Sequence, residues 1–123
     1  MTQEELKRTA HRIKDHIHRT PVLSSRLLNT IAGADLYFKC ENLQRMGAFK
    51  MRGAANAILS LSEADRNKGV VTHSSGNFAQ AVSLSAKSIG IKAYIVMPDT
   101  APQVKRQAVK DYGGILTICP PTL

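Results

Sequence analysis

The amino-acid sequence predicts an α/β protein in which a parallel βαβαβ unit follows N-terminal helices and one strand. From residue 69 onward, three short apolar runs alternate with two segments of helical period. Glycine closes each of these helical segments, at Gly90 and at Gly113. Strands that are separated by helices pair in parallel through right-handed crossovers. The second half of the chain is therefore expected to form one parallel sheet.

The first half of the chain is predicted to contain two helices, a strand and a third helix. The residues TQEE form a capping-box pattern that begins the first helix, which ends before Pro21. A second, short helix is expected over residues 25–32, with Gly33 as its stop. Alternating apolar and polar residues predict a strand over residues 35–41. FKMRGAANAILSL, which starts at Phe49, has the composition of the third helix.

The elements of the second half follow in a regular order. GVVTHSS, IKAYIVMP and ILTICP are the three expected strands. NFAQAVSLSAKSIG and APQVKRQAVKDYGG are the two expected helices. The buried side of the first of these helices is expected to consist of Phe78, Ala81, Val82, Ser85 and Ile89.

Composition excludes several classes of function. The 123 residues are 43% hydrophobic and 21% charged, which is ordinary for a soluble globular protein. The formal net charge of +8 arises from scattered basic residues without interleaved aromatic side chains, so we expect no nucleic-acid partner. The apolar runs are too short to span a membrane. Cys40 and Cys119 match no metal-ligand spacing, so we expect no metal and a reducing, cytoplasmic location.

One candidate site lies where the first strand of the predicted sheet ends. Open parallel sheets bind ligands beyond the carboxyl ends of their strands, and THSSGNFAQ occupies that position. Small side chains and one glycine there precede a helix N-terminus, whose free N–H groups and dipole favour a carboxylate or a phosphate. A capped helix with a glycine turn would show the same local pattern, so this stretch alone leaves both interpretations open.

A second candidate is Lys50, in the stretch GAFKMRGA. Phe49 and Met51 flank it, and a helix N-terminus disfavours an ammonium ion. A neutral lysine amine can condense with an aldehyde. An ordinary surface lysine at the junction of a loop and a helix remains the alternative.

Taken together, GAFKMRGA and SSGNFAQA resemble the pyridoxal-phosphate enzymes of the threonine dehydratase and serine racemase family. HRTPVLSS, FKCENLQ, YIVMPDTAP and YGG extend the resemblance over essentially the whole chain. The resemblance implies the N-terminal part of the fold type II, tryptophan synthase β-like architecture. Residues 1–68 would then be the N-terminal segment of the large cofactor domain that carries the lysine. Residues 69–123 would be part of the small α/β domain.

The resemblance also implies a role for each matching residue. Lys50 would form the internal aldimine with pyridoxal 5'-phosphate and act as the base on one face of the substrate α-carbon. Phe49 would lie against the cofactor, and Asn77 would reach the pyridine 3-oxygen. Ser75 would be the acid and base on the opposite face in racemising members. The loop that takes the substrate carboxylate would consist of Ser74, Ser75, Gly76 and Asn77.

The reaction implied by the resemblance is that of a serine or threonine ammonia-lyase or of a serine racemase. The substrate would be serine, threonine or a similar β-hydroxy amino acid. The sequence departs from the family pattern at Ala48, where serine is usual, and at Phe78, where many members have histidine. These residues leave open whether elimination or racemisation is preferred.

A glycine-rich loop for the cofactor phosphate is missing from the sequence, and family members are much longer. We therefore expect the chain to be the N-terminal part of such an enzyme and to be incomplete alone. It would act as a homo-oligomer or with a complementing second fragment. The alternative is a non-catalytic α/β fragment that serves as a binding or interaction module through its uncovered sheet.

Overall fold

The computed structural model describes residues 2–121 of the chain. Within this range, α-helices and short 3-10 helices (η) alternate with five strands. The elements in chain order are α1 (Gln3–Ile13), η1 (Lys14–His16), β1 (Val22–Leu23), α2 (Arg26–Ala32), β2 (Phe38–Lys39), η2 (Glu41–Leu43), η3 (Arg45–Gly47), α3 (Lys50–Ser60), α4 (Glu63–Asn67), β3 (Val70–His73), α5 (Asn77–Ile89), β4 (Ala93–Pro98), α6 (Gln103–Asp111) and β5 (Ile115–Cys119).

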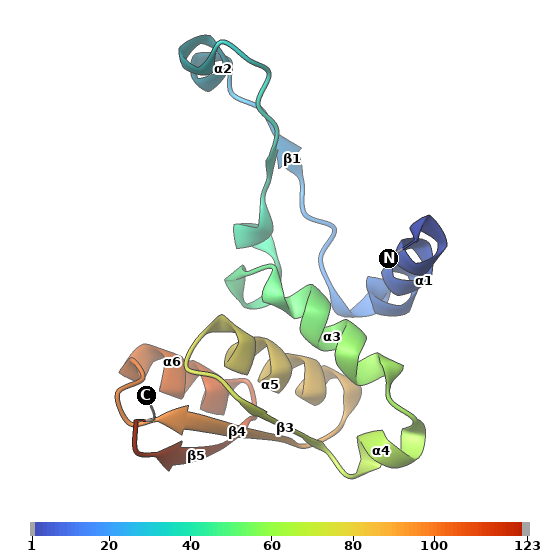
Figure 1. Ribbon diagram of the computed structural model, residues 1–123, viewed down its shortest axis with the longest axis vertical. Helices are drawn as coiled ribbons and strands as arrows, with labels where there is room; N and C mark the ends of the chain where they lie inside the picture. The colour runs from blue at the N-terminus through green and yellow to red at the C-terminus, as the bar shows by residue number, and fades with distance from the viewer. Residues whose placement is uncertain (1, 122–123) are drawn as a thin grey trace.

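A three-stranded parallel sheet with the order β3-β4-β5 confirms the predicted α/β fold. Val70 pairs with Ala93, and Tyr94 pairs with Ile115. One helix makes each crossover, and α5 and α6 lie on the same face of the sheet (Figure 1). α3 packs against α5 on the side away from the sheet. We call this assembly of β3–β5 with α3, α5 and α6 the body.

The core of the body lies between the sheet and its helices. The central strand β4 turns Ala93, Ile95 and Met97 inward, and each of them is at most 1% exposed. Small buried residues on the facing helices, such as Ala54 on α3 and Ala81 on α5, allow the helix axes to approach closely. The buried hydrophobic residues of this core are Ala54, Ile58, Ala79, Ala81, Val82, Ala86, Ala93, Ile95, Met97, Ala101 and Val109.

The opposite face of the sheet carries a row of exposed apolar side chains across its three strands. Val71 pairs with Tyr94, and Tyr94 pairs with Ile115. Their exposed fractions are 73%, 39% and 45%. Parallel sheets are normally covered on both faces, so this row is a surface that another layer could cover.

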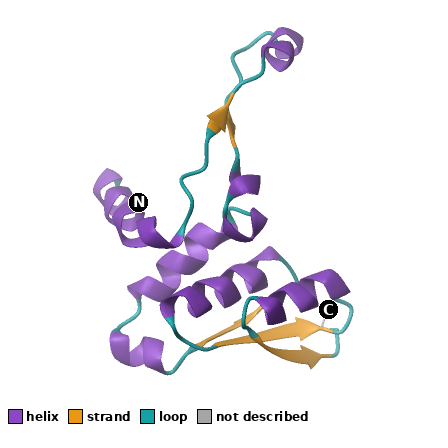
Figure 2. Ribbon diagram, turned by 180° about the vertical axis from the view of Figure 1, so that it is seen from behind, coloured by secondary structure: helices purple, strands orange, loops and turns teal. Residues whose placement is uncertain are grey.

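Residues 21–40 leave the body as an extended arm, with α2 at its tip (Figures 1 and 2). β1 and β2 form the stem of the arm as an antiparallel pair with only two residues in each strand. Several large apolar side chains of the arm are exposed. They include Leu27 at 70%, Ile31 at 73% and Tyr37 at 73%.

The arm corrects one prediction and confirms another. The strand that the sequence predicts over residues 35–41 is only Phe38–Lys39, and its partner β1 was not predicted. Two-residue strands lack the length from which an alternating pattern can be recognised. The second helix follows the prediction, because the Ser25 side chain caps it and Gly33 ends it in the left-handed conformation.

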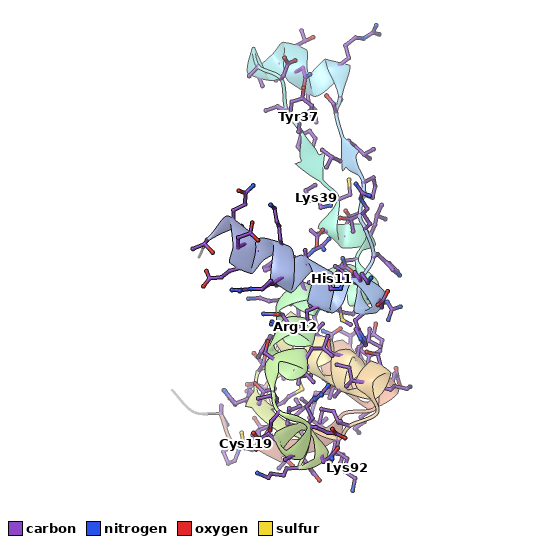
Figure 3. The ribbon with its side chains drawn as sticks, turned by 90° about the vertical axis from the view of Figure 1, so that its right-hand side faces the viewer. His11, Arg12, Tyr37, Lys39, Lys92 and Cys119 are labelled. Carbon is purple, nitrogen blue, oxygen red and sulfur yellow. The ribbon has the colours of Figure 1, made fainter. Side chains whose placement is uncertain are left out.

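α1 packs against α3 and is shorter than the sequence pattern suggests. The Thr2 capping box is present, but the α-helix ends at Ile13 and continues as the 3-10 helix η1. The Arg12 guanidinium donates to Asn56 Oδ1 at 2.7 Å and to Ser60 Oγ at 2.8 Å, and it thereby joins α1 to α3. Figure 3 shows Arg12 at this junction.

The predicted buried side of α5 is correct except at its first residue. Ala81, Val82 and Ser85 are buried, whereas Phe78 is 37% exposed. Phe78 lies in the first turn of α5 and lines a groove between α3 and β3. Among residues 2–121, no helix combines the length and the apolar character that crossing a membrane requires.

Candidate functional site

The predicted carboxylate loop lies at the carboxyl edge of the parallel sheet. β3 ends at His73, the loop of Ser74, Ser75 and Gly76 follows, and α5 begins at Asn77. The Ser74 hydroxyl oxygen accepts a hydrogen bond from the Gly76 N–H at 3.4 Å. Gly76 is the N-cap residue of α5, and no side chain caps this helix. The N–H groups of its first turn are therefore available to an anionic ligand.

The caps divide the helices of the described residues into two groups. Hydroxyl side chains cap α1, α2 and α4. No side-chain hydrogen bond caps α3, α5 or α6. The first turns of these uncapped helices carry Lys50, Asn77 and Lys105, respectively. The uncapped N-termini thus coincide with polar side chains that could contact a ligand.

Lys50 is the first residue of α3, and its side chain is exposed. Its Nζ lies 5.1 Å from the centroid of the Phe49 ring, and Phe49 is 58% exposed. Met51 turns the other way and is completely buried. The two apolar neighbours that single out Lys50 in the sequence therefore differ in role, since Phe49 contacts the amine and Met51 belongs to the interior.

Met51 also fixes the start of α3 against α5. The Ser85 hydroxyl of α5 donates to the Met51 sulfur at 3.4 Å. α3 and α5 pack against each other, and both begin toward the side of the body at which the parallel strands end (Figure 1). The structure therefore brings the helix start that bears Lys50 and the loop of residues 74–77 to one side of the body. The catalytic and binding roles of these residues stay predictions.

Asn77 has a partner that the sequence did not suggest. The Lys105 ammonium donates to Asn77 Oδ1 at 2.6 Å, and the Lys105 side chain is half-buried. This contact joins the first turn of α6 to the first turn of α5. A sequence signal for Lys105 did exist, because a basic residue in the first turn of a helix opposes the helix dipole. The same argument drew attention to Lys50.

An ion pair lies two residues after Lys50. Arg52 donates to both carboxylate oxygens of Glu41, from Nη2 at 2.7 Å and from Nε at 2.8 Å. The Thr20 hydroxyl donates to the same carboxylate at 2.5 Å. The hydrogen bond from Arg52, followed by that from Thr20, holds the pKa of Glu41 at about 2, against the effect of burial. The pair ties the start of α3 to η2, at the base of the arm.

Gln44 reinforces the same junction from the interior. Its side chain is almost fully buried and is hydrogen-bonded at both ends. The amide nitrogen donates to the His18 carbonyl at 2.8 Å, and the amide oxygen accepts from the His18 N–H at 2.8 Å. Arg45 N–H donates to that oxygen as well, at 2.9 Å. The segment before Lys50 is therefore held by side chains that the sequence analysis did not single out.

No group of three His, Cys, Asp or Glu side chains that could hold a metal ion occurs among residues 2–121.

Comparison with known proteins places the chain in a family. The family described as "Pyridoxal-phosphate dependent enzyme" matches residues 13–122. The chain therefore belongs to the pyridoxal-phosphate-dependent enzymes. Its sequence is 52% identical to a serine racemase of Dictyostelium discoideum over 123 residues, all of this chain and 38% of that protein. It is 51% identical to a β-hydroxyaspartate dehydratase of Paracoccus denitrificans over 121 residues, 98% of this chain and 38% of that protein.

Solved structures agree with the sequence comparison. The crystal structure of the Dictyostelium discoideum serine racemase matches all of this chain with a TM-score of 0.95 and 52% identity, and the match covers 40% of that chain. A processed threonine deaminase from Solanum lycopersicum matches 99% of this chain with a TM-score of 0.86 and 35% identity, over 37% of that chain. The chain thus spans about two fifths of the length of these relatives. These matches confirm the predicted fold type II architecture.

The residues present fit one part of a pyridoxal-phosphate site. An exposed lysine amine, an uncapped helix N-terminus and an asparagine amide lie on one side of the body. Lys50 would hold the cofactor, and the Asn77 amide would donate a hydrogen bond to it. A glycine-rich loop that could hold the cofactor phosphate does not occur among residues 2–121. The described residues therefore fit the part of the cofactor that carries its aldehyde, and not its phosphate.

Proposed function

We propose that this chain supplies the cofactor lysine and the carboxylate-binding loop of an enzyme that acts on small β-hydroxy amino acids. The reaction class is ammonia elimination or racemisation. The observation that carries the proposal is the exposed Lys50 amine at the start of uncapped α3, beside uncapped α5 at the carboxyl edge of the sheet. The names of the relatives, serine racemase and β-hydroxyaspartate dehydratase, support the same substrate class.

The chain's own residues would divide the chemistry among them. Pyridoxal phosphate, when bound, withdraws electron density from the α-carbon of an amino acid and makes its proton removable. Lys50 Nζ takes this proton on one face of the substrate. The N–H groups at the start of α5 and the Ser74 hydroxyl bind the substrate carboxylate and orient the α-carbon. The Ser75 hydroxyl, exposed in the same loop, returns a proton on the opposite face when the reaction is racemisation.

We further propose that residues 1–68 belong to the large cofactor domain and residues 69–123 to the small α/β domain. A complementing polypeptide, equivalent to the part of the relatives that this chain does not match, covers the arm. Leu27, Ile31 and Tyr37 offer apolar surface on the arm. The net charge of +8 favours an acidic complement.

A second apolar surface supports the same complement. A groove of about 620 Å³ lies between α1 and α3. Leu6, Ile13 and Ile17 contribute apolar side chains to it, and Lys14 and Lys39 contribute positive charge. Figure 3 shows Lys39 on the arm. A second copy of this chain, which would make a homo-oligomer, is the competing occupant, and sedimentation of the isolated chain distinguishes the two.

The test of the cofactor role uses the 123-residue chain with pyridoxal 5'-phosphate. Borohydride reduction followed by peptide mapping should place a stoichiometric pyridoxyl group on Lys50. Lys50→Ala should abolish it, and the matched variant Lys110→Ala, at an exposed lysine on α6, should retain it. Equal labelling of Lys50 and Lys110 would instead support the non-catalytic module, for which the exposed sheet face is the supporting observation.

The test of the reaction adds a complementing polypeptide made from the part of the Dictyostelium discoideum relative that this chain does not match. Release of keto acid and ammonia from L-serine or L-threo-3-hydroxyaspartate would indicate elimination, and formation of D-serine would indicate racemisation. Ser75→Ala should reduce racemisation far more than elimination, because only racemisation needs a proton on the second face. Equal loss of both reactions would contradict the role given to Ser75.

A further inference from the structure

The contact between Lys105 and Asn77 is the polar feature of this region that the proposed function leaves unexplained. Lys105 Nζ lies 2.6 Å from Asn77 Oδ1 and bridges the first turns of α6 and α5. Neither helix has a side-chain cap. An ammonium ion near helix N-termini is electrostatically unfavourable, and the short charge-assisted hydrogen bond offsets part of this cost. A nearby anion would offset more of it.

This contact fixes which way the Asn77 amide faces. An asparagine side chain carries an acceptor oxygen and a donor nitrogen, whereas a lysine ammonium has only donors. Lys105 can therefore bind the oxygen alone. The Asn77 Nδ2–H₂ group then faces away from Lys105 and can donate a hydrogen bond to another group. Without the Lys105 ammonium, the Asn77 amide could rotate and present either its oxygen or its nitrogen on the side opposite residue 105.

We propose that Lys105 is a positioning residue that holds the Asn77 amide ready to donate a hydrogen bond to the ring 3-oxygen of pyridoxal phosphate. This inference rests on the proposed function, because it takes Lys50 as the residue that carries the cofactor. Two effects act together. The fixed Asn77 amide presents a donor to the ring 3-oxygen. The positive charge of Lys105 favours the anionic form of this oxygen. Lys105 acts through Asn77 and has no contact with substrate in this assignment.

Lys110 provides a matched control on the same helix. It lies in the last turn of α6 and is exposed, at the end where a cation is favourable. Lys105→Met removes the charge and keeps the length of the side chain, and Lys105→Arg keeps the charge. Lys110→Met repeats the change of charge without touching Asn77.

The first measurement needs no cofactor. In an ¹⁵N-labelled chain, the side-chain amide resonances of Asn77 should shift in Lys105→Met and remain close to those of the unaltered chain in Lys105→Arg and Lys110→Met. The second measurement adds pyridoxal phosphate and records the visible and near-ultraviolet bands, whose ratio reports the charge on the ring 3-oxygen. Lys105→Met should move this ratio toward the neutral oxygen and weaken apparent cofactor binding about fivefold, the loss expected for one hydrogen bond.

A double-mutant cycle separates positioning from a general effect of charge. If Lys105 acts through Asn77, then Lys105→Met should change the band ratio in the unaltered chain and have little further effect in Asn77→Ala. An unchanged ratio in Lys105→Met, with the Lys50 adduct intact, would overturn the role of Lys105 alone. Additive effects in the cycle would overturn it as well. Absence of the Lys50 adduct from the unaltered chain in the presence of the complementing polypeptide would overturn the proposed function and this inference together.

Discussion

Glu41 and Arg52 form the interaction that places the start of α3 most firmly. The guanidinium binds both carboxylate oxygens, and the two side chains are only 19% and 31% exposed, respectively. Charge-assisted hydrogen bonds are shorter and stronger than neutral ones, and the bidentate arrangement adds geometric specificity. Because Arg52 follows Lys50 by two residues, the pair restrains the position from which the Lys50 side chain extends.

The lowered pKa of Glu41 predicts a defined dependence of stability on pH. Its folded-state pKa of about 2 lies below the ordinary value of 4.5. The stabilisation is therefore fully present above about pH 4.5 and is lost as the pH falls toward 2. Urea unfolding between pH 7 and pH 2.5 should show this loss, on the order of 2–3 kcal/mol for the unaltered chain. Arg52→Met should be less stable at pH 7 and should show a weaker acid dependence.

The exposed pair of Lys7 and Glu4 supplies the control for that experiment. Its side chains are 63% and 73% exposed, so Lys7→Met should change the free energy of unfolding by less than about 0.5 kcal/mol. If Arg52→Met retained the acid dependence of the unaltered chain in full, other carboxylates would have to be its source.

Sequence reasoning singled out the candidate side chains of the site but did not find the residues that support them. Lys50 and Asn77 were recognisable because each begins a predicted helix next to small or aromatic residues. Lys105 is 28 residues from Asn77, and Arg52 is 11 residues from Glu41. Such pairings depend on how α6 and η2 pack, which no local pattern encodes. Of these supporting residues, only Lys105 could have been noticed from its charge, because it lies in the first turn of a predicted helix.

At the scale of elements, close approach between α5, α6 and β5 depends on Gly114. A Cβ atom there would collide with the Ser83 hydroxyl and would lie 2.8 Å from Val109 Cγ1. Both neighbours are buried, so neither has room to move away. A side chain at residue 114 would therefore separate elements that now pack directly.

Gly114→Ala should lower the free energy of unfolding by about 1–3 kcal/mol, the cost typical of overpacking. Gly53→Ala is the matched comparison, because Gly53 lies inside α3 with nothing within 4 Å of an added Cβ. That change should raise the free energy of unfolding by roughly 0.5–1 kcal/mol through helix propensity. Denaturant unfolding of both variants measures the difference. Equal effects of the two substitutions would contradict the packing argument.

Long and buried elements were predicted better than short ones. β3, β4, β5 and their connecting helices were predicted close to their observed bounds, because apolar runs and terminal glycines mark them. α4 (Glu63–Asn67) and β1 (Val22–Leu23) were missed, since five and two residues carry too little periodicity. The 3-10 turns before Lys50 were not predicted as helices. One of them contains Met46 in the left-handed conformation, which its sequence does not mark.

At the scale of the whole molecule, the apolar surface is distributed unevenly. The body buries its core, whereas the arm exposes large apolar residues at its tip and along its stem. Exposed apolar patches of this kind are typical of interaction surfaces. Figure 3 shows Tyr37 on the arm.

Leu27→Ser combined with Ile31→Ser should leave the stability of the isolated chain almost unchanged, within about 0.5 kcal/mol per site. Both side chains are at least 70% exposed, so little packing is lost. The same double variant should bind the complementing polypeptide more weakly, which titration calorimetry can measure. Ile95→Ala, at a fully buried position, should by contrast cost about 2–5 kcal/mol. Loss of stability in the arm variant would show that the arm is packed in solution.

The order of the sheet has a consequence for how the chain is made. Each strand pairs with the next one in the sequence, as Val70 does with Ala93 and Tyr94 with Ile115. During synthesis, β4 and β5 therefore each meet a partner strand that has already emerged, and the sheet can assemble vectorially on the ribosome. The arm emerges earlier and finds no such partner among residues 2–121. Its apolar tip would be the part of the nascent chain that most needs protection by a chaperone.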